Sequence, residues 1–169
     1  MTDVEFWSLI DEAREASRGS TRRQEAVLRK LLGKLSKDDV AEFAIRYDNL
    51  IRKAYRWDLW GAAYVIGGGC SDDGFWDFRS WLVSRGKKIY QAALKKPESL
   101  AKAVSRTDRD RAWKSFLNPA RFVWAEQTGR PMDECPGLGS NLGEQPVGEE
   151  WSAEELPKLF PRLWKEFGR

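Results

Sequence analysis

The sequence predicts an all-α protein, a single-domain bundle of about six to eight helices. Three observations support this class: apolar residues recur at spacings of three and four, capping residues precede most of these runs, and the alternation typical of strands is nearly absent. A chain of 169 residues, 41% of them hydrophobic, is long enough to bury a sizeable core. We expect one domain over residues 1–169, with a helical core (1–128), a loop (129–150) and a C-terminal docking segment (151–169).

The first three helices are each predicted from a capping residue. Thr2 with Glu5 has the spacing of a capping box, in which each side chain bonds the backbone N–H of the other residue. Thr21 with Gln24 is interpreted as a second box, and Ser36 as the cap of a third helix whose first turn is acidic. Apolar residues follow each cap at helical spacing, so we expect amphipathic helices that bury one face.

The next segment, WDLWGAAYVI at residues 57–66, is apolar on nearly every side. A helix of that kind is buried all round, so we expect it to lie at the centre of the bundle. Gly67, Gly68 and Gly69 follow it, and three consecutive glycines are costly within a helix. The helix is therefore expected to end at these glycines.

A long helix is expected to begin within residues 70–74 and to end near Leu94. Its inward stripe includes the phenylalanines of the first two turns. Pro97 is expected to start a short helix, because proline fits the first helical position. Asp108 is interpreted as the cap of another helix.

The C-terminal third is predicted to contain one more helix, a loop and a docking segment. Asn118 with Pro119 has the pattern of a helix start. Residues 129–150 are rich in glycine, proline and acids and show no helical period, so we expect a loop. Ser152 with Glu155 is interpreted as a last capping box, ahead of an apolar tail that docks onto the bundle.

The composition excludes several kinds of function. The chain has no histidine, which excludes Ser-His-Asp and Cys-His catalysis and every His-ligated metal. Cys70 and Cys135 are too few for a disulfide framework or a zinc site, so no structural metal and no cofactor is expected. The uncharged stretch at 59–71 is too short and too glycine-rich to span a bilayer, and the N-terminus is unlike a secretory signal. We therefore expect a cytoplasmic protein with reduced thiols and no membrane partner.

A long motif lies within residues 58–90. It includes the runs 58–64 (DLWGAAY) and 68–73 (GGCSDD), and then Phe75, Phe78, Arg79, Trp81, Leu82, Gly86 and Tyr90. Together with Phe6, Trp7, Leu9 and Ile10 near the start, and Ala93, Leu94, Pro97, Ser99 and Leu100 further on, the chain resembles a bacterial family known as domain of unknown function 4240, over about residues 4–101. The resemblance implies an actinobacterial-type cytoplasmic protein. It implies no reaction, ligand or catalytic residue.

The segment CSDDGFWDFRSWL at residues 70–82 is the most specific feature for function. At 100° per residue, Arg79 projects from the edge of the apolar stripe of this helix. A guanidinium there keeps its charge and needs carboxylates or carbonyls as partners. We expect Asp58 or Asp73 to be that partner.

Two interpretations of this segment stay open. In the structural one, the acidic turn caps the helix and Arg79 ties the helix to its neighbour. In the functional one, Asp72, Asp73 and Arg79, with Trp60 and Tyr64, form the polar floor of an aromatic-lined pocket. Trp76 is expected to be an exposed contact residue beside this polar cluster. Cys70 is expected to be a buried, inert thiol rather than a nucleophile. The candidate ligand-binding residues are Trp60, Tyr64, Cys70, Ser71, Asp72, Asp73, Trp76 and Arg79.

The first hypothesis for function is a non-catalytic binding or regulatory protein of the bacterial cytoplasm. It recognises a protein or a small ligand through the aromatic and acidic surface of residues 71–81. The second is a histidine-free enzyme with Asp72 or Asp73 as general base and Arg79 orienting an anionic substrate. The third and least favoured is a nucleic-acid binder through the basic runs 14–34 and 102–114, because the net charge is only +3. No metal site is predicted at the two aspartates, which offer too few oxygens for calcium.

Overall fold

The computed structural model describes residues 1–104, 113, 118–137 and 145–168. These residues contain nine α-helices and two 3-10 helices and no strand, and eight of the α-helices have seven or more residues, which confirms the predicted all-α class. The helices are α1 (Asp3–Ser17), α2 (Thr21–Leu32), α3 (Lys37–Lys53), α4 (Trp57–Gly67), α5 (Asp72–Ser84), α6 (Lys87–Lys95), η1 (Pro97–Lys102), α8 (Pro119–Thr128), η2 (Met132–Glu134), α9 (Leu156–Leu159) and α10 (Pro161–Phe167).

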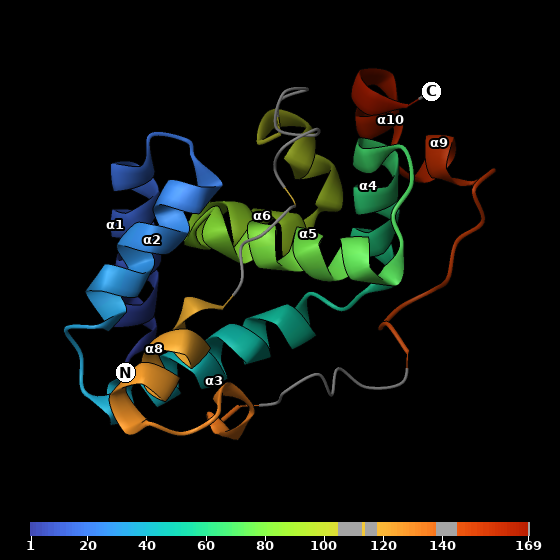
Figure 1. Ribbon diagram of the computed structural model, residues 1–169. Helices are drawn as coiled ribbons and strands as arrows, with labels where there is room; N and C mark the ends of the chain where they lie inside the picture. The colour runs from blue at the N-terminus through green and yellow to red at the C-terminus, as the bar shows by residue number, and fades with distance from the viewer. Residues whose placement is uncertain (105–112, 114–117, 138–144, 169) are drawn as a thin grey trace.

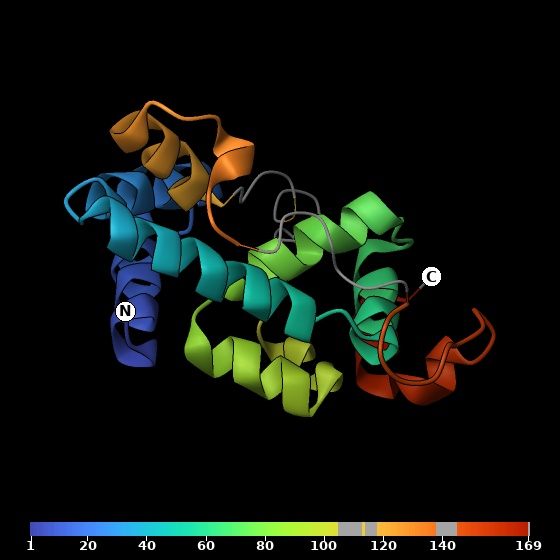
Figure 2. The same cartoon turned by 90° about the horizontal axis from the view of Figure 1, so that it is seen from below.

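The helices are arranged from one end of the molecule to the other. Helices α1 and α2 lie side by side at one end, and α4 and α10 lie side by side at the other (Figures 1 and 2). Between them α5 contacts α1, α3, α4 and α6, and eight of its 13 residues are buried. One hydrophobic cluster connects both ends, as expected for helices that each bury one stripe.

The predicted helix at 57–66 is present as α4, and six of its residues are buried. It ends as expected at the glycines, where Gly68 adopts the left-handed conformation (φ 68°). The central position in the bundle belongs to α5, however, whereas α4 lies toward the end that α10 covers (Figure 1). The reason is the C-terminal tail: a Cβ at Gly61 of α4 would lie 2.7 Å from the Phe160 ring, so the tail packs directly on the α4 backbone.

Two of the first three predicted caps are confirmed. The Thr2–Glu5 capping box is complete, and the Ser36 side chain accepts from the backbone N–H of Asp39. The second box was wrong, because Ser20, not Thr21, caps α2 by accepting from Arg23. The Gln24 side chain instead enters the core and donates to the Ser84 carbonyl at 2.7 Å.

The single long helix expected from residue 70 to Leu94 was wrong. The chain forms α5 and α6 separately, with a break at Arg85 and Gly86. Gly86 has φ of 89°, which an L side chain rarely adopts, and a Cβ there would collide with the Asp11 carboxylate of α1. The glycine therefore lets α6 turn away from α5 while α1 packs against the junction.

The C-terminal third follows the prediction in outline. Asn118 caps α8, and the predicted short helix at Pro97 is the 3-10 helix η1, whereas the Asp108 cap lies outside the described residues. Within the expected loop the described part contains η2 and one parallel bridge between Arg56 and Val147. The apolar tail packs on the bundle, and four of its side chains are buried: Leu156, Phe160, Leu163 and Phe167.

The last capping box was wrong. The Glu155 carboxylate does accept from the backbone N–H of Ser152 at 2.7 Å, but α9 begins only at Leu156. The helix is short because Phe160 leaves the helical conformation ahead of Pro161, as is usual before proline.

The Gly86 junction yields a stability prediction. We expect Gly86→Ala to lower the free energy of unfolding by more than the roughly 1–2 kcal/mol that a left-handed alanine costs, because Gly86 has φ 89° and ψ 166°, a conformation essentially confined to glycine. Gly19→Ala is the control, because Gly19 also has a positive φ (83°) and nothing lies within 4 Å of its would-be Cβ. Urea unfolding of both variants measures the difference, and equal losses would contradict this backbone constraint at Gly86.

Candidate functional site

The acidic turn expected at the site is the N-terminus of α5. Ser71 is its cap, and its side chain accepts from the backbone N–H of Gly74 at 3.2 Å. Asp72 and Asp73 are exposed in the first turn, where carboxylates complement the positive end of the helix dipole. This arrangement is the one expected from the structural interpretation of these residues.

The two predicted aromatic residues of α4 contact different partners. The Trp60 ring stacks on Phe75 of α5, with centroids 4.9 Å apart, and its Nε1 donates to the Cys70 carbonyl at 3.0 Å. Tyr64 instead meets the Trp151 ring edge-on at 5.2 Å. The structure therefore brings Trp60 to the start of α5 and places Tyr64 on the side of α4 that the C-terminal segment covers.

Arg79 is among the most buried residues of the protein, at 1% exposure. The expected partners Asp58 and Asp73 were wrong. Instead the guanidinium donates to two backbone carbonyls, from Nε to Phe75 at 3.2 Å and from Nη1 to Ile51 at 3.1 Å. It is also surrounded by rings, with its central carbon 4.8–5.2 Å from the ring centroids of Tyr55, Phe75 and Trp76.

This arrangement satisfies the C-terminal end of α3. The last carbonyls of a helix have no partner within the helix, and they carry its negative dipole end. The Ile51 carbonyl accepts from Arg79, and the Leu50 carbonyl accepts both from the Ala54 N–H and from the Tyr90 hydroxyl, the latter at 2.7 Å. Burial lowers the pKa of Arg79 to about 10, so the guanidinium is still charged at neutral pH. The expected Asp58 is used elsewhere, in a two-pronged ion pair with Arg56 at 2.5 and 2.9 Å.

Cys70 has the properties of an unreactive thiol. Burial raises its pKa to about 12, although the nearby Arg79 acts in the opposite direction. Its sulfur lies 3.7 Å from the Ser71 carbonyl, and neither cysteine is in a disulfide. Asp77, one turn after Asp73, has a pKa raised by burial and by the charge of Asp73.

Of the eight predicted ligand-binding residues, Trp76 alone lines either of the two main cavities described next. The first cavity, which we call the Trp76 pocket, has a volume of about 700 Å³. It lies where α3, α5, the start of α8 and η2 meet, and it is lined by Tyr47, Asp48, Trp76, Ser80, Asn118, Arg121, Phe122, Pro131, Met132 and Asp133.

The polar end of the Trp76 pocket is held by an ion pair. Arg121 Nη2 donates to Asp48 Oδ2 at 2.6 Å, and Asn118 lies 3.5 Å from the other carboxylate oxygen. The carboxylate of Asp48 is largely buried. Beside it, the side chains of Tyr47 and Ser80 form a hydrogen bond with each other. The opposite walls are the Trp76, Phe122 and Met132 side chains, so the pocket joins an apolar space to one fixed acceptor–donor pair.

Sequence reasoning missed Asp48 and Arg121. One signal was available, because Asp48 follows Ala44 by four residues and precedes Ile51 by three, on the buried face of α3. A charged residue at such a position needs a buried partner. The partner itself lies 73 residues away, beyond the reach of helical periodicity.

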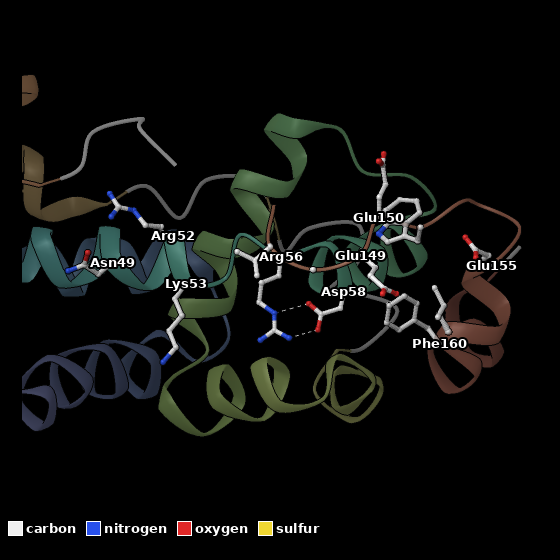
Figure 3. A pocket seen from close by; sticks show the side chains of 13 residues that line it. Asn49, Arg52, Lys53, Arg56, Asp58, Glu149, Glu150, Glu155 and Phe160 are labelled. Atoms are coloured by element: carbon white, nitrogen blue, oxygen red, sulfur yellow. Dashed lines mark hydrogen bonds and ion pairs between the residues drawn. The ribbon is translucent and has the colours of Figure 1, made fainter. Parts of the chain in front are cut away.

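The second cavity, which we call the Arg56 cleft, has a volume of about 870 Å³ (Figure 3). One side is the C-terminal end of α3 with the α3–α4 connection, and the other is the segment 147–160. Its lining residues are Asn49, Arg52, Lys53, Arg56, Asp58, Val147, Gly148, Glu149, Glu150, Trp151, Glu155, Leu159 and Phe160.

Two further searches bear on the kind of site. In the described part of the chain, no three or more Cys, Asp and Glu side chains gather closely enough to hold a metal ion. Over the same residues, no helix combines the length and the apolar character needed to cross a membrane.

Arg79 yields a prediction that separates its structural role from a ligand contact. Arg79→Ala leaves the Ile51 carbonyl buried without a partner, so we expect the free energy of unfolding to fall by about 3 kcal/mol and the melting temperature by roughly 6–12 °C. Arg52→Ala is the control, because Arg52 is exposed and directly follows Ile51. Calorimetry on both variants measures the effect, and an unchanged melting temperature for Arg79→Ala would sink the structural role.

The Cys70 thiol yields a reactivity prediction. A pKa of about 12 in place of 9.0 reduces the thiolate population at neutral pH by about a thousandfold. We therefore expect native protein to resist labelling by iodoacetamide at pH 7.5, while unfolding in urea exposes both cysteines to the reagent. Mass spectrometry counts the labels, and rapid native labelling of Cys70 would indicate an activated nucleophile.

The comparisons agree with the resemblance in the motif. The family model described as "Protein of unknown function (DUF4240)" matches residues 1–121, which include α1 to α6 and the start of α8. Neither the curated proteins nor the solved structures contain a match to the chain. Because the family model covers most of the sequence, the chain belongs to the DUF4240 family of proteins of unknown function.

Proposed function

We propose that this protein is a non-catalytic binding protein of the bacterial cytoplasm that takes up a small ligand in the Trp76 pocket. The proposal keeps the surface around residues 71–81 as the binding region and narrows it to the side of α5 that Trp76 and Ser80 present to the pocket. Two cysteines without a disulfide support a reducing compartment.

The observation that carries the proposal is the pocket itself. Its volume of about 700 Å³ is within the range of cavities that enclose small organic ligands, roughly 300–1,000 Å³. Its apolar walls are preformed, because the Arg79 guanidinium lies 5.2 Å from the Trp76 ring centroid and supports that ring. A preformed wall reduces the ordering cost of binding.

The lining also indicates the chemistry of the ligand. A flat apolar body fits between Trp76, Phe122 and Met132. The Asp48–Arg121 pair presents a hydrogen-bond acceptor and a donor side by side, so a group that both donates and accepts, such as a primary amide, fits the polar end. The ion pair is nearly neutral as a unit, which disfavours a ligand with a large net charge.

A thermal-shift screen against aromatic amides, acids and amines tests the proposal. We expect a binding compound at about a hundred times its Kd to stabilise the wild type by about 2.7 kcal/mol, or roughly 5–11 °C. Met132→Trp fills the pocket from a residue that is 42% exposed, so it is expected to fold normally and to lose most of this shift. Val4→Trp, at an exposed position of α1 that does not line the pocket, is the matched control. A hit that stabilises Met132→Trp as well as the wild type would contradict the assignment of the site.

A further inference from the structure

The Arg56 cleft separates charges of opposite sign on its two sides (Figure 3). Arg52 and Lys53 lie at the end of α3, whereas Glu149 and Glu150 lie on the segment opposite. None of these four side chains forms an ion pair or a hydrogen bond within the described chain, and the ion pair inside the cleft is the local one between Arg56 and Asp58. The two charged sets therefore lie on the two sides of the cleft without neutralising each other. Arg52 and Lys53 extend from α3 in different directions (Figure 3).

Apolar side chains also line the cleft, and Val147 pairs with Arg56 through the parallel bridge. Val147 is 71% exposed and Leu159 is 52% exposed, and both line the cleft beside the Phe160 ring. Large apolar side chains with this exposure are few among the described residues, so two of them in one cleft mark a contact surface.

The backbone that carries these groups is held in place by hydrogen bonds across the cleft. The Val147 N–H donates to the Tyr55 carbonyl and the Trp57 N–H donates to the Val147 carbonyl, both at 3.0 Å. Trp151 Nε1 donates to the Trp57 carbonyl at 2.8 Å. Arg56 Nη1 also donates to the Leu94 carbonyl at 3.1 Å, and this bond connects the α3–α4 connection to α6. The two sides are thus joined at the base while their charged side chains stay apart.

We propose that the Arg56 cleft is a second binding site, which takes a short extended peptide segment of a partner protein. The segment has an acidic residue against Arg52 or Lys53, an apolar residue against Val147 and Leu159, and a basic residue against Glu149 or Glu150. Complementary charges at the ends of the segment set its direction, and the apolar contact supplies the burial.

A peptide fits these observations better than a small ion. A phosphate or carboxylate alone would engage the Arg52 and Lys53 side and leave the carboxylates and the apolar residues unused. An extended segment of seven residues reaches at most about 23–25 Å, so one short peptide can present all three kinds of group. The site is separate from the Trp76 pocket, because the two cavities share no lining residue.

Selection from a random heptapeptide phage library tests this proposal without a known partner. We expect wild-type protein to enrich peptides with an acidic residue toward one end, an apolar residue between and a basic residue toward the other. The double variant Arg52→Glu with Lys53→Glu is expected to reject the acidic end. Arg22→Glu with Arg23→Glu is the matched control, because these adjacent basic residues are exposed on α2 and line neither cavity.

Fluorescence anisotropy with the best enriched peptide gives the affinity. We expect the Arg52/Lys53 variant to bind at least about tenfold more weakly than the wild type and the Arg22/Arg23 control, and about 0.5 M salt to weaken wild-type binding. No enrichment, enrichment without the charge pattern, or equal affinity for both double variants would overturn the proposal. Peptide binding that survives in Met132→Trp keeps this site distinct from the Trp76 pocket, and loss of binding in that variant would place the peptide there instead.

Discussion

The C-terminal end of helix α3 is the constraint on which the rest of the structure depends. The last carbonyls of a helix lie beyond its regular hydrogen-bond ladder and need other donors. The buried Arg79 guanidinium from α5 donates to the Ile51 carbonyl, and the Tyr90 hydroxyl from α6 donates to the Leu50 carbonyl. These bonds fix α5 and α6 relative to α3, and the rings around Arg79 hold the charge in a site without a described carboxylate. Trp76 is one of these rings, so the same residue connects the core to the wall of a cavity.

The residues that carry the family motif are used mainly for this internal framework. Asp58 is paired with Arg56, Trp60 bonds the Cys70 carbonyl, and Arg79 and Tyr90 bond the end of α3. Each cavity, by contrast, is completed by residues beyond the match to the family model, at 122–133 and at 147–160. The family part therefore builds a scaffold, and the C-terminal third of this chain supplies the second side of each site. The two proposed sites therefore draw part of their lining from connecting segments, where binding residues are often found.

How well each feature could be predicted depended on how far along the sequence its hydrogen-bond partner lies. The caps at Thr2, Ser36 and Asn118 were predictable because a cap bonds a backbone N–H within three residues. The cap at Ser20 was missed by one residue, since adjacent hydroxyls have nearly the same local pattern. Arg79 was correctly expected at the edge of the apolar stripe, but its hydrogen-bond partners were not predicted. Every residue has a backbone carbonyl, so the sequence does not indicate which carbonyl of α3 accepts from Arg79.

By itself the sequence determined the all-α class, most helix boundaries and the inward faces, because these follow from periodicity and from bonds between near neighbours. It also determined that this chain contributes no histidine side chain to any site. Only the tertiary structure decided the break at Gly86, where the Asp11 side chain of α1 lies beside the backbone. It also decided the position of α4, which the C-terminal tail covers at Gly61. Only the tertiary structure paired Asp48 with Arg121 and set Arg52 and Lys53 opposite Glu149 and Glu150. These relations arise where separate helices cross, and the geometry of a crossing depends on the packing of the whole core rather than on any local run of residues.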